Sequence, residues 1–378
     1  MAPPPTISPI HLGPVRIEFP VALAAMSGYT DWPTRTIARR LGAGYTICEV
    51  MLDRFILNVT KGKKARRYLR VTDEDHPVGA QLMGSSADEF AAAAIKLVQA
   101  GFDVIDLNFG CPVKKVLGKC RGGYLLSQPQ KALEIVARVR EALPPHVPLT
   151  VKMRRGMDDT PESRDRFFTI FDGALALGAA AITVHGRTVR QRYEGRSSWE
   201  FVRQSKARAG QRVIFGSGDL FTAEDCVAMF AQTGVDGITV ARGAIGNPWI
   251  FREIRAVAAG QPLPEGKGGQ VQFAGTARRV LRTNWTCPPF PTPSLLEQRE
   301  VMAEHYRLAE EAYGPKRAFS VMYTQGIKYS RLHPQPEQVR DAFVAVRRAD
   351  EWWAVLEQWY AEDLPRRVLR GPEHDADG

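Results

Sequence analysis

The feature that most constrains the fold of this chain is a regular alternation of short β-rich runs with helical patterns of about 10 to 15 residues. This alternation predicts repeated βα units around a parallel sheet, because parallel strands need a crossover connection. The runs are apolar throughout, which favours a closed (β/α)8 TIM barrel over an open doubly wound sheet. The expected strands are Val21–Met26, Tyr45–Val50, Pro77–Met83, Val104–Phe109, Leu149–Met153, Ala180–His185, Val213–Ser217 and Gly237–Ala241.

Helical patterns occupy the intervals between these runs, and several of them begin after a residue suited to an N-cap. Thr222 precedes one pattern, and Ser85–Ser86 precedes another. A hydroxyl at this position accepts a hydrogen bond from a backbone N–H of the first helical turn. The expected helices include Ala87–Ala100, Pro129–Leu143, Glu162–Leu177, Ala223–Gln232 and Pro248–Ala258.

The alternation breaks near residue 260, where the sequence becomes rich in Gly and Pro. Beyond a second irregular stretch, helical periodicity returns, and its first segment ends at Gly314, a plausible C-cap. The chain is therefore expected to carry an all-α domain after its barrel. The expected divisions are a flexible N-terminal arm (1–18), the barrel (19–260), a linker and insert (261–294), the helical domain (295–366) and a disordered tail (367–378).

The five cysteines, Cys48, Cys111, Cys120, Cys226 and Cys287, are few and widely scattered. Secreted disulfide frameworks have a different pattern, so a cytoplasmic protein is expected. No Cys/His cluster has the spacing of a zinc site, and no metal is expected. The sequence also lacks an apolar run of roughly 18 residues, the length needed to cross a bilayer, and its proline-rich start does not resemble a secretory signal.

The chain carries a formal charge of +10 that is unevenly distributed. From residue 271 onward, 15 Lys and Arg balance 15 Asp and Glu, so the excess lies in the first 270 residues. Two runs concentrate it: Lys61 to Arg70 and Arg187 to Arg196. A polyanionic partner such as RNA is one interpretation, and two solvated loops are the other.

Polar groups follow nearly every expected strand, at the end where barrel enzymes place their active sites. Packing alone does not require this arrangement. The groups are Met26–Ser27, Glu49, Gln81, Asn108 to Cys111, Lys152 and Arg154, His185 to Arg187, Ser217 to Asp219, and Ala241 to Gly243.

The last two strands end in GSGD and ARGAIGNPW, which are rich in small residues. Small residues let backbone N–H groups approach a phosphate, and Arg242 could pair with it. Ordinary tight turns are the alternative for either loop. Gln81 and Lys152 could contact a flat ring above the barrel mouth, where Lys152 would stabilise negative charge. Alternatively, Lys152 is the Schiff-base lysine of an aldolase.

Cys111 is the candidate reactive thiol, because it follows the fourth strand in NFGCPVKK with two lysines nearby. Cys120, nine residues later in a Gly-rich loop, is the rival. Cys48 and Cys226 fall within an expected strand and an expected helix, so both are predicted to be structural.

At these residues the sequence resembles the tRNA-dihydrouridine synthases, in particular a bacterial branch of that family. The resemblance extends from about Val21 to Ile254 and more weakly into the helical region. Its most specific motifs are DLNFGCP followed by KK, and HGRT. Further matches are AAMSGYTDWPTR, CEVM, VGAQLMG, GGYLL, LTVKMRRG, GSGDL and ARGAIGNPWIFREI.

The resemblance implies a barrel that binds FMN, followed by a helical domain that binds tRNA, and we expect a monomer. It implies that FMN, reduced by NADPH, supplies hydride to C6 of a uridine while Cys111 protonates C5. Asn108 and Arg154 match residues that hold the uracil edge. The FMN-binding residues would be Ala25, Met26, Ser27, Gln81, Lys152, His185, Ser217, Gly218, Asp219, Ala241 and Arg242.

Three alternatives remain open at this point. A flavin reductase of free pyrimidines or another small enone would need neither the basic runs nor the C-terminal helices. A non-catalytic flavoprotein that binds RNA is the second alternative. A flavin-free aldolase acting on phosphorylated sugars is the third, but it leaves the cysteine of the GCP motif unexplained.

Overall fold

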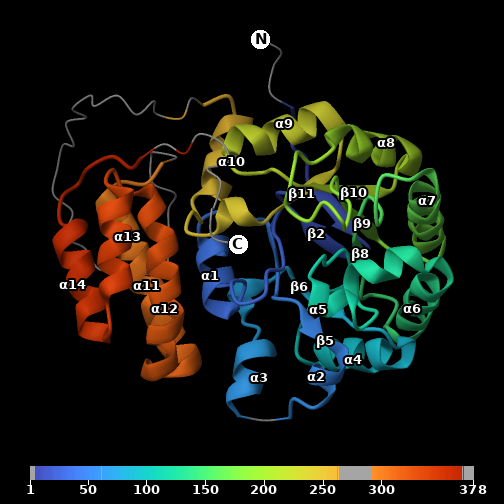
Figure 1. Ribbon diagram of the computed structural model, residues 1–378, viewed down its shortest axis with the longest axis horizontal. Coiled ribbons are helices and arrows are strands. Elements are labelled where there is room, and N and C mark those ends of the chain that lie inside the picture. Colours follow the sequence, from blue (N-terminus) through green and yellow to red (C-terminus); the bar gives the residue numbers. More distant parts are fainter. Residues whose placement is uncertain (1–4, 61, 262, 264–291, 368, 370–378) are drawn as a thin grey trace.

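The computed structural model describes residues 5–60, 62–261, 263, 292–367 and 369, and within them eight parallel strands close into a barrel (Figure 1). The TIM barrel predicted from the sequence is therefore confirmed. β11 pairs with β3 on one side and β4 pairs with β6 on the other, which completes the ring. In pairing order the strands are β3 (Val21–Leu23), β4 (Tyr45–Ile47), β6 (Val78–Met83), β7 (Val104–Phe109), β8 (Leu149–Arg154), β9 (Ala181–His185), β10 (Val213–Ser217) and β11 (Gly237–Val240).

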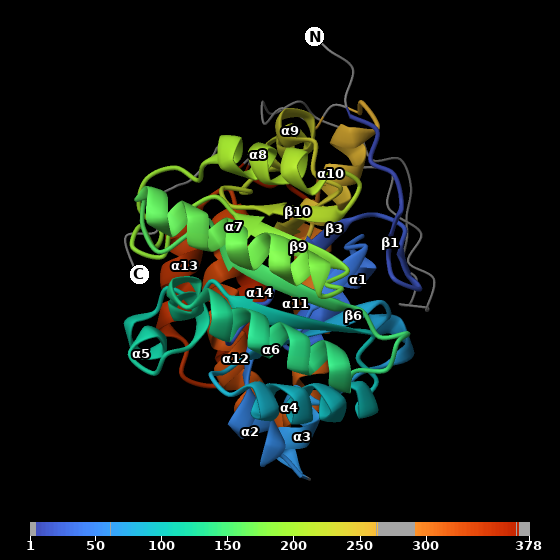
Figure 2. The same ribbon diagram turned by 90° about the vertical axis from the view of Figure 1, so that its right-hand side faces the viewer.

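Helices cover the outside of the barrel, and their apolar faces pack on the strands in one continuous core. At the start of α9 the Thr222 hydroxyl accepts a hydrogen bond from the Asp225 amide at 3.1 Å, as the N-cap pattern predicts. Figure 2 shows α6 and α7 on the side that faces away from the C-terminal helices. The covering helices are α1 (Trp32–Arg40), α4 (Ala87–Gln99), α6 (Pro129–Ala142), α7 (Pro161–Ala176), α8 (Trp199–Ala209), α9 (Ala223–Thr233) and α10 (Ile250–Ala258).

The expectation of a flexible arm over 1–18 is wrong for residues 10–17, which form an antiparallel hairpin. β1 (Ile10–Leu12) pairs with β2 (Val15–Ile17), and the hairpin packs against the N-terminal end of the barrel. Leu12 and Ile17 are buried there. The reason is hydrophobic: the inward side chains of a barrel need a cover at its lower end, and the alternating apolar residues of this segment supply one.

The C-terminal region consists of α11 (Leu295–Tyr313), α12 (Pro315–Tyr329), α13 (Pro336–Ala345) and α14 (Ala349–Trp359). The first of these helices ends at Gly314, which adopts a positive φ of 76° that glycine tolerates easily. These helices form a second core, which also takes in Trp32 and Trp249 from the barrel. Most of the expected linker and insert (261–294), most of the expected tail (367–378) and Cys287 lie outside the described residues.

Buried and partly buried ion pairs and hydrogen bonds join the helical region to the barrel. Arg252 donates to both carboxylate oxygens of Glu297 at 2.7 and 2.9 Å, and the Trp249 indole N–H donates to the same carboxylate at 3.1 Å. Arg366, from the end of the described chain, pairs with Glu253 on α10 at 2.6 Å. The two regions therefore share both apolar and polar contacts.

Among the described helices, none is long and apolar enough to cross a membrane. Within the same residues, no three His, Cys, Asp or Glu side chains are grouped as they would be to hold a metal ion.

Candidate functional site

The polar residues predicted at the strand ends meet at the C-terminal mouth of the barrel. Strand register places Asn108 beside Lys152 across the β7–β8 pair. In the same way, Arg154 lies beside His185, and His185 lies beside Ser217. Neighbouring parallel strands thus bring side chains that are far apart in sequence to nearly the same level.

Cys111 lies at this mouth, on the loop between β7 and the short helix α5 (Lys114–Leu117). Its backbone N–H donates to Oδ1 of Asn108 at 3.0 Å. Gly122 packs directly against it, because a Cβ added at that glycine would lie 2.8 Å from the Cβ of Cys111. Burial raises the pKa of the Cys111 thiol, although a backbone hydrogen bond and Arg154 oppose the shift. The thiol is therefore protonated at neutral pH.

The other described cysteines differ from Cys111 in position. Cys120 has an exposed side chain and a positive φ of 55°. Cys48 and Cys226 are fully buried, as expected of structural residues. Burial also raises the pKa of both buried thiols, to about 12 for Cys48.

Lys152 and His185 carry strongly shifted pKa values below the mouth. Burial, with Arg154 nearby, lowers the pKa of Lys152 to about 8, although Asp106 opposes the shift. Burial and four surrounding cations lower the pKa of His185 well below its usual value, so its ring is neutral. The backbone N–H of Arg187 donates to Nδ1 of His185 at 3.1 Å, which leaves the proton on Nε2 as a donor.

The loops after β10 and β11 form the other side of the mouth, where the sequence predicts a phosphate site. Gly218 has a φ of 109°, and an added Cβ would collide with the side chain of Ser197. The side chain of Arg242 is 38% exposed, and it lies 3.9 Å from the Asp219 carboxylate. A backbone without a side chain beside a guanidinium suits a phosphate group.

Asp219 was predicted to bind the cofactor, but its carboxylate is directed toward the protein. One oxygen accepts from the Ser197 N–H at 2.7 Å, and the other accepts from Arg187 at 2.6 Å. The neighbouring residues Ser217 and Ala241 are the last residue of β10 and the residue after β11. Asp219 therefore holds the loop after β10 against Ser197 and Arg187.

The first βα loop carries Ala25, Met26 and Ser27, which follow β3 at the same mouth. The loop is held from both sides. The Met26 N–H donates to the Thr30 hydroxyl at 2.9 Å, and the Gly28 N–H donates to the buried carboxylate of Glu49 at 2.9 Å. Ser27 remains exposed above these contacts.

Arg154, predicted to hold the uracil edge, is buried under the loop after β9. Its Nη1 donates to the carbonyls of Thr188 and Arg192 at 2.8 and 2.6 Å. Its guanidinium also lies 5.6 Å from the ring centroid of Tyr193, which is 57% exposed. Sequence reasoning missed this tyrosine, although an aromatic residue within the basic run 187–196 was a usable signal.

The two basic runs are less uniform than the sequence suggests. Arg187 is buried and donates to the Gly195 carbonyl and to Asp219, so it does not belong to a solvated surface. In the first run, which includes α3 (Lys63–Tyr68), Arg67 pairs with Glu49 and Arg70 pairs with Glu311.

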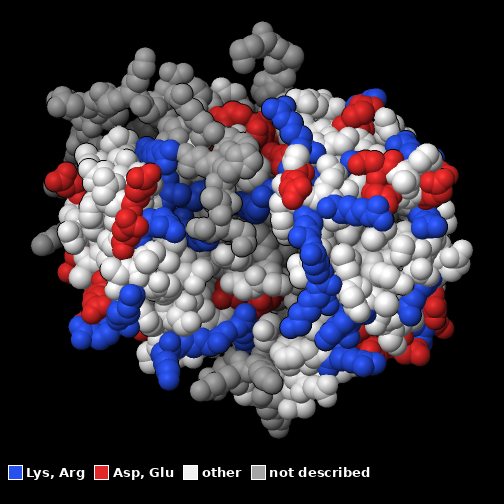
Figure 3. All heavy atoms as spheres, viewed as in Figure 1, with Lys and Arg blue, Asp and Glu red and all other residues white. Residues whose placement is uncertain are grey.

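Exposed cations nevertheless gather over the barrel mouth. Figure 3 shows a band of Lys and Arg side chains across the centre of this face, between areas of mixed charge. The loops after β7 and β9 contribute the exposed residues Lys114, Lys115, Arg192 and Arg196. Positive charge therefore surrounds the barrel mouth.

Sequence reasoning also missed Asp106, a buried residue two positions before Asn108 on β7. Side chains two apart on a strand face the same way, so this carboxylate shares the barrel interior with Asn108. It accepts hydrogen bonds from Gln81 and Thr150, both at 2.6 Å. The alternation of the strand was the signal that could have found it.

The family model described as "Dihydrouridine synthase (Dus)" matches residues 22–364. The chain belongs to the dihydrouridine synthase family. A curated relative named tRNA-dihydrouridine synthase B, from Pseudomonas aeruginosa PAO1, is 30% identical over 94% of this chain and 97% of its own length. The protein of the same name from Escherichia coli K12 is 30% identical over 93% and 99%. A probable tRNA-dihydrouridine synthase from Rickettsia conorii is 32% identical over 81% and 82%.

Solved structures show that this family member shares its barrel with other proteins. Histamine dehydrogenase from Rhizobium sp. 4-9 has a TM-score of 0.52 at 16% identity, covering 67% of this chain and 48% of that one. A 2-naphthoyl-CoA reductase has a TM-score of 0.55 at 11% identity, covering 68% and 52%. The chain spans about half the length of these two proteins, and the likeness is one of fold alone.

Proposed function

We propose that this chain is a tRNA-dihydrouridine synthase that uses FMN and takes its reducing equivalents from NADPH. Membership of the dihydrouridine synthase family and the names of the full-length relatives support this function. The observation that carries the proposal is the protonated Cys111 thiol, held at the mouth of a barrel whose opposite side suits a phosphate. The enzyme would reduce the C5–C6 double bond of a uridine.

The residues at the mouth fit FMN. Gly218 and Arg242 suit its phosphate, and the Nε2–H of His185 offers a donor beside them. Lys152, largely protonated at pH 7, would stabilise negative charge on the ring system, and Gln81 is a further proposed contact. When bound, FMN supplies the hydride that adds to C6 of uracil. The other proposed contacts are Ala25, Met26, Ser27, Ser217, Asp219 and Ala241.

Cys111 would deliver the proton that C5 requires, acting as a general acid. A raised pKa suits this role, because the thiol must carry its proton when the substrate arrives. The hydrogen bond from its backbone N–H to Asn108 holds the loop in place.

The substrate base would enter the mouth from RNA. Leaving the base stack costs a few kcal/mol, which contacts at the site must offset. Asn108 and Arg154 are the proposed contacts to the uracil edge. Lys114, Lys115, Arg192 and Arg196 would hold phosphates around the opening, with help from the helical domain, and binding should then weaken as salt increases.

The test is to incubate purified protein with NADPH and an unmodified tRNA transcript, and to measure dihydrouridine by mass spectrometry. Cys111→Ala should keep its yellow flavin but lose roughly 10²- to 10⁴-fold in rate, the usual contribution of a general acid. Cys120→Ala is the matched control and should retain the parent rate, because that side chain is exposed.

Full activity in Cys111→Ala would discard the assignment of the acid. Turnover of free uracil without RNA binding at low salt would instead select a reductase of small pyrimidines. RNA binding and flavin without turnover would select a non-catalytic role.

We also propose that the enzyme acts as a monomer in the cytoplasm. The four described cysteines are all free thiols, which supports a reducing compartment. Light scattering of the purified protein, with and without tRNA, would test the monomer.

A further inference from the structure

The carboxylate of Asp106 occupies an unusual place, in the interior of the barrel beneath the candidate site. It is 1% exposed. One oxygen accepts from the Thr150 hydroxyl on the neighbouring strand, and the other accepts from Nε2 of Gln81 on the strand at its opposite side, both at 2.6 Å. A carboxylate is costly to bury, so a chain that needed only packing here would place an apolar residue.

From Asp106 a continuous chain of hydrogen bonds leads up to Cys111. Gln81 accepts through Oε1 from Nδ2 of Asn108 at 2.7 Å. Asn108 in turn accepts through Oδ1 from the backbone N–H groups of Gly110 and Cys111, both at 3.0 Å. Two side-chain amides therefore connect a buried carboxylate to the loop that carries the thiol.

The two ends of this chain determine the orientation of both amides. The Asp106 carboxylate can only accept, so the NH2 group of Gln81 must face it. The backbone N–H groups of Gly110 and Cys111 can only donate, so the side-chain carbonyl of Asn108 must face them. The NH2 group of Asn108 then has to face Gln81. One of its two N–H bonds is used there, and the second remains as a donor beside the mouth.

We propose that Asp106 is a positioning residue: through Gln81 and Asn108 it holds the Cys111 loop and directs the second Asn108 N–H toward the substrate. This inference rests on the proposed function, because it assigns the uracil edge as the acceptor of that N–H. Asp106 itself touches neither substrate nor cofactor in this arrangement.

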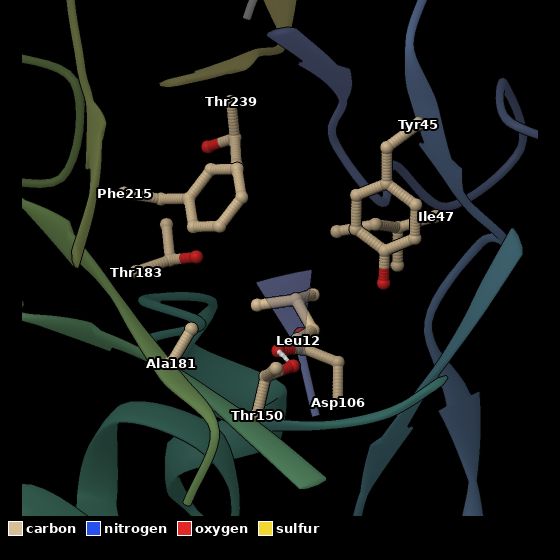
Figure 4. Close-up of a pocket in the computed structure, with 9 residues that line it drawn as sticks. All are labelled: Leu12, Tyr45, Ile47, Asp106, Thr150, Ala181, Thr183, Phe215 and Thr239. Atoms are coloured by element: carbon tan, nitrogen blue, oxygen red, sulfur yellow. Dashed lines mark hydrogen bonds between the residues drawn. The ribbon is translucent and has the colours of Figure 1, made fainter. Parts of the chain in front are cut away.

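The surroundings of Asp106 indicate that its main role is in the hydrogen bonds that lead through Gln81 and Asn108 to the Cys111 loop. Below it lies a small internal cavity, shown in Figure 4, where Tyr45, Thr183 and Thr239 also project inward. Among the described atoms, the Tyr45 and Thr239 hydroxyls have no hydrogen-bond partner, so Asp106 does not serve them. Lys152 from the neighbouring strand is the nearby cation that offsets the buried negative charge.

Three substitutions separate the hydrogen-bond acceptor from the charge. Asp106→Asn keeps one acceptor oxygen for Gln81 and removes the charge. Asp106→Leu has a similar shape and removes the acceptor. Gln81→Met breaks the same chain one residue later, which keeps the test available if the leucine variant does not fold.

The first measurement is the rate at which iodoacetamide alkylates Cys111, followed by peptide mass spectrometry so that other cysteines are distinguished. Asp106→Leu and Gln81→Met should raise this rate roughly tenfold, because the loop opens more often. Asp106→Asn should stay within about threefold of the parent. This measurement needs neither flavin turnover nor RNA, so it tests the series of hydrogen bonds from Asp106 to Cys111 even if the proposed function fails.

The second measurement is dihydrouridine formation on the tRNA transcript. Asp106→Leu should lower kcat by roughly 10- to 100-fold at similar KM, because a misplaced catalytic group reacts slowly in a correctly bound complex. Flavin content, read from the visible spectrum, should be retained. Unchanged alkylation in both Asp106→Leu and Gln81→Met would overturn the proposal. The proposal would also be overturned if Asp106→Leu lost flavin, raised KM and lowered kcat together, since that pattern indicates a purely structural residue.

Discussion

The barrel mouth and the interface between the barrel and the helical region both bury charged groups, but they arrange them differently. At the interface, opposite charges form ion pairs: Arg252 pairs with Glu297, and Arg366 pairs with Glu253. At the mouth, hydrogen bonds run in one direction, from backbone N–H groups through Asn108 to a buried carboxylate.

The difference separates a structural site from a functional one. Paired charges face one another and offer little to a ligand, whereas a directed series of hydrogen bonds leaves donors on its open side. The mouth also holds basic groups whose pKa values are lowered, the neutral His185 and Lys152, and such shifts cluster at functional sites. Changes at the interface should therefore affect stability, and changes at the mouth should affect chemistry.

The largest expected effect on stability comes from Glu297→Ala at the interface. The substitution removes the carboxylate that holds Arg252 and the Trp249 indole N–H. We expect the free energy of unfolding to fall by about 3 kcal/mol, the lower end for a buried pair, because Glu297 is partly exposed. Urea unfolding followed by circular dichroism would measure the loss.

Glu200→Ala is the matched control for this prediction. It also removes a carboxylate paired with an arginine, but both side chains of the Glu200–Arg203 pair are more than half exposed. Such a pair contributes little, so the urea midpoint should stay unchanged. Equal losses in the two variants would show that the interface pair has no special role.

A second prediction concerns His305, which is buried between the Thr34 hydroxyl and the hydroxyl of Tyr329. Burial lowers its pKa to about 4. In the unfolded chain a histidine titrates near 6.5, so below that pH the unfolded state binds the proton first. The stability contributed by neutral His305 is complete above pH 6.5 and is lost as the pH falls toward 4, by about 3 kcal/mol.

His305→Gln should therefore reduce the difference between urea midpoints at pH 7 and pH 4.5. His146→Gln is the control, because His146 is exposed on the loop before β8. If His305→Gln keeps the full pH dependence of the parent, acid sensitivity must arise elsewhere.

Sequence reasoning predicted the barrel well because its signals are local and repeated. Apolar runs, N-caps such as Thr222 and the glycine at 314 act within a few residues of where they occur. The hairpin at 10–17 escaped notice because its strands are three residues long and acquire their role only by covering the barrel.

The site was partly predictable for the same reason. Strand ends indicated which loops meet, so Cys111, Lys152 and His185 were expected there. Whether Asp219 points to a ligand or to Ser197, and whether Arg187 is solvated or buried, depends on contacts between loops that are distant in sequence. Periodicity carries no information about such contacts.

The smallest expected effect is the pH dependence that Lys152 gives to the reaction. It tests the difference between mouth and interface, because titrating Lys152 should change the chemistry at the mouth without removing an ion pair. With a pKa of about 8, Lys152 is mostly protonated at pH 7 and mostly neutral at pH 9. If its charge stabilises the ring system, the rate of flavin reduction by NADPH should fall about tenfold across this range. Stopped-flow absorbance would measure the rate. Lys152→Met should be slower and should lose this dependence, and a variant that keeps the same profile would assign the titration to another group.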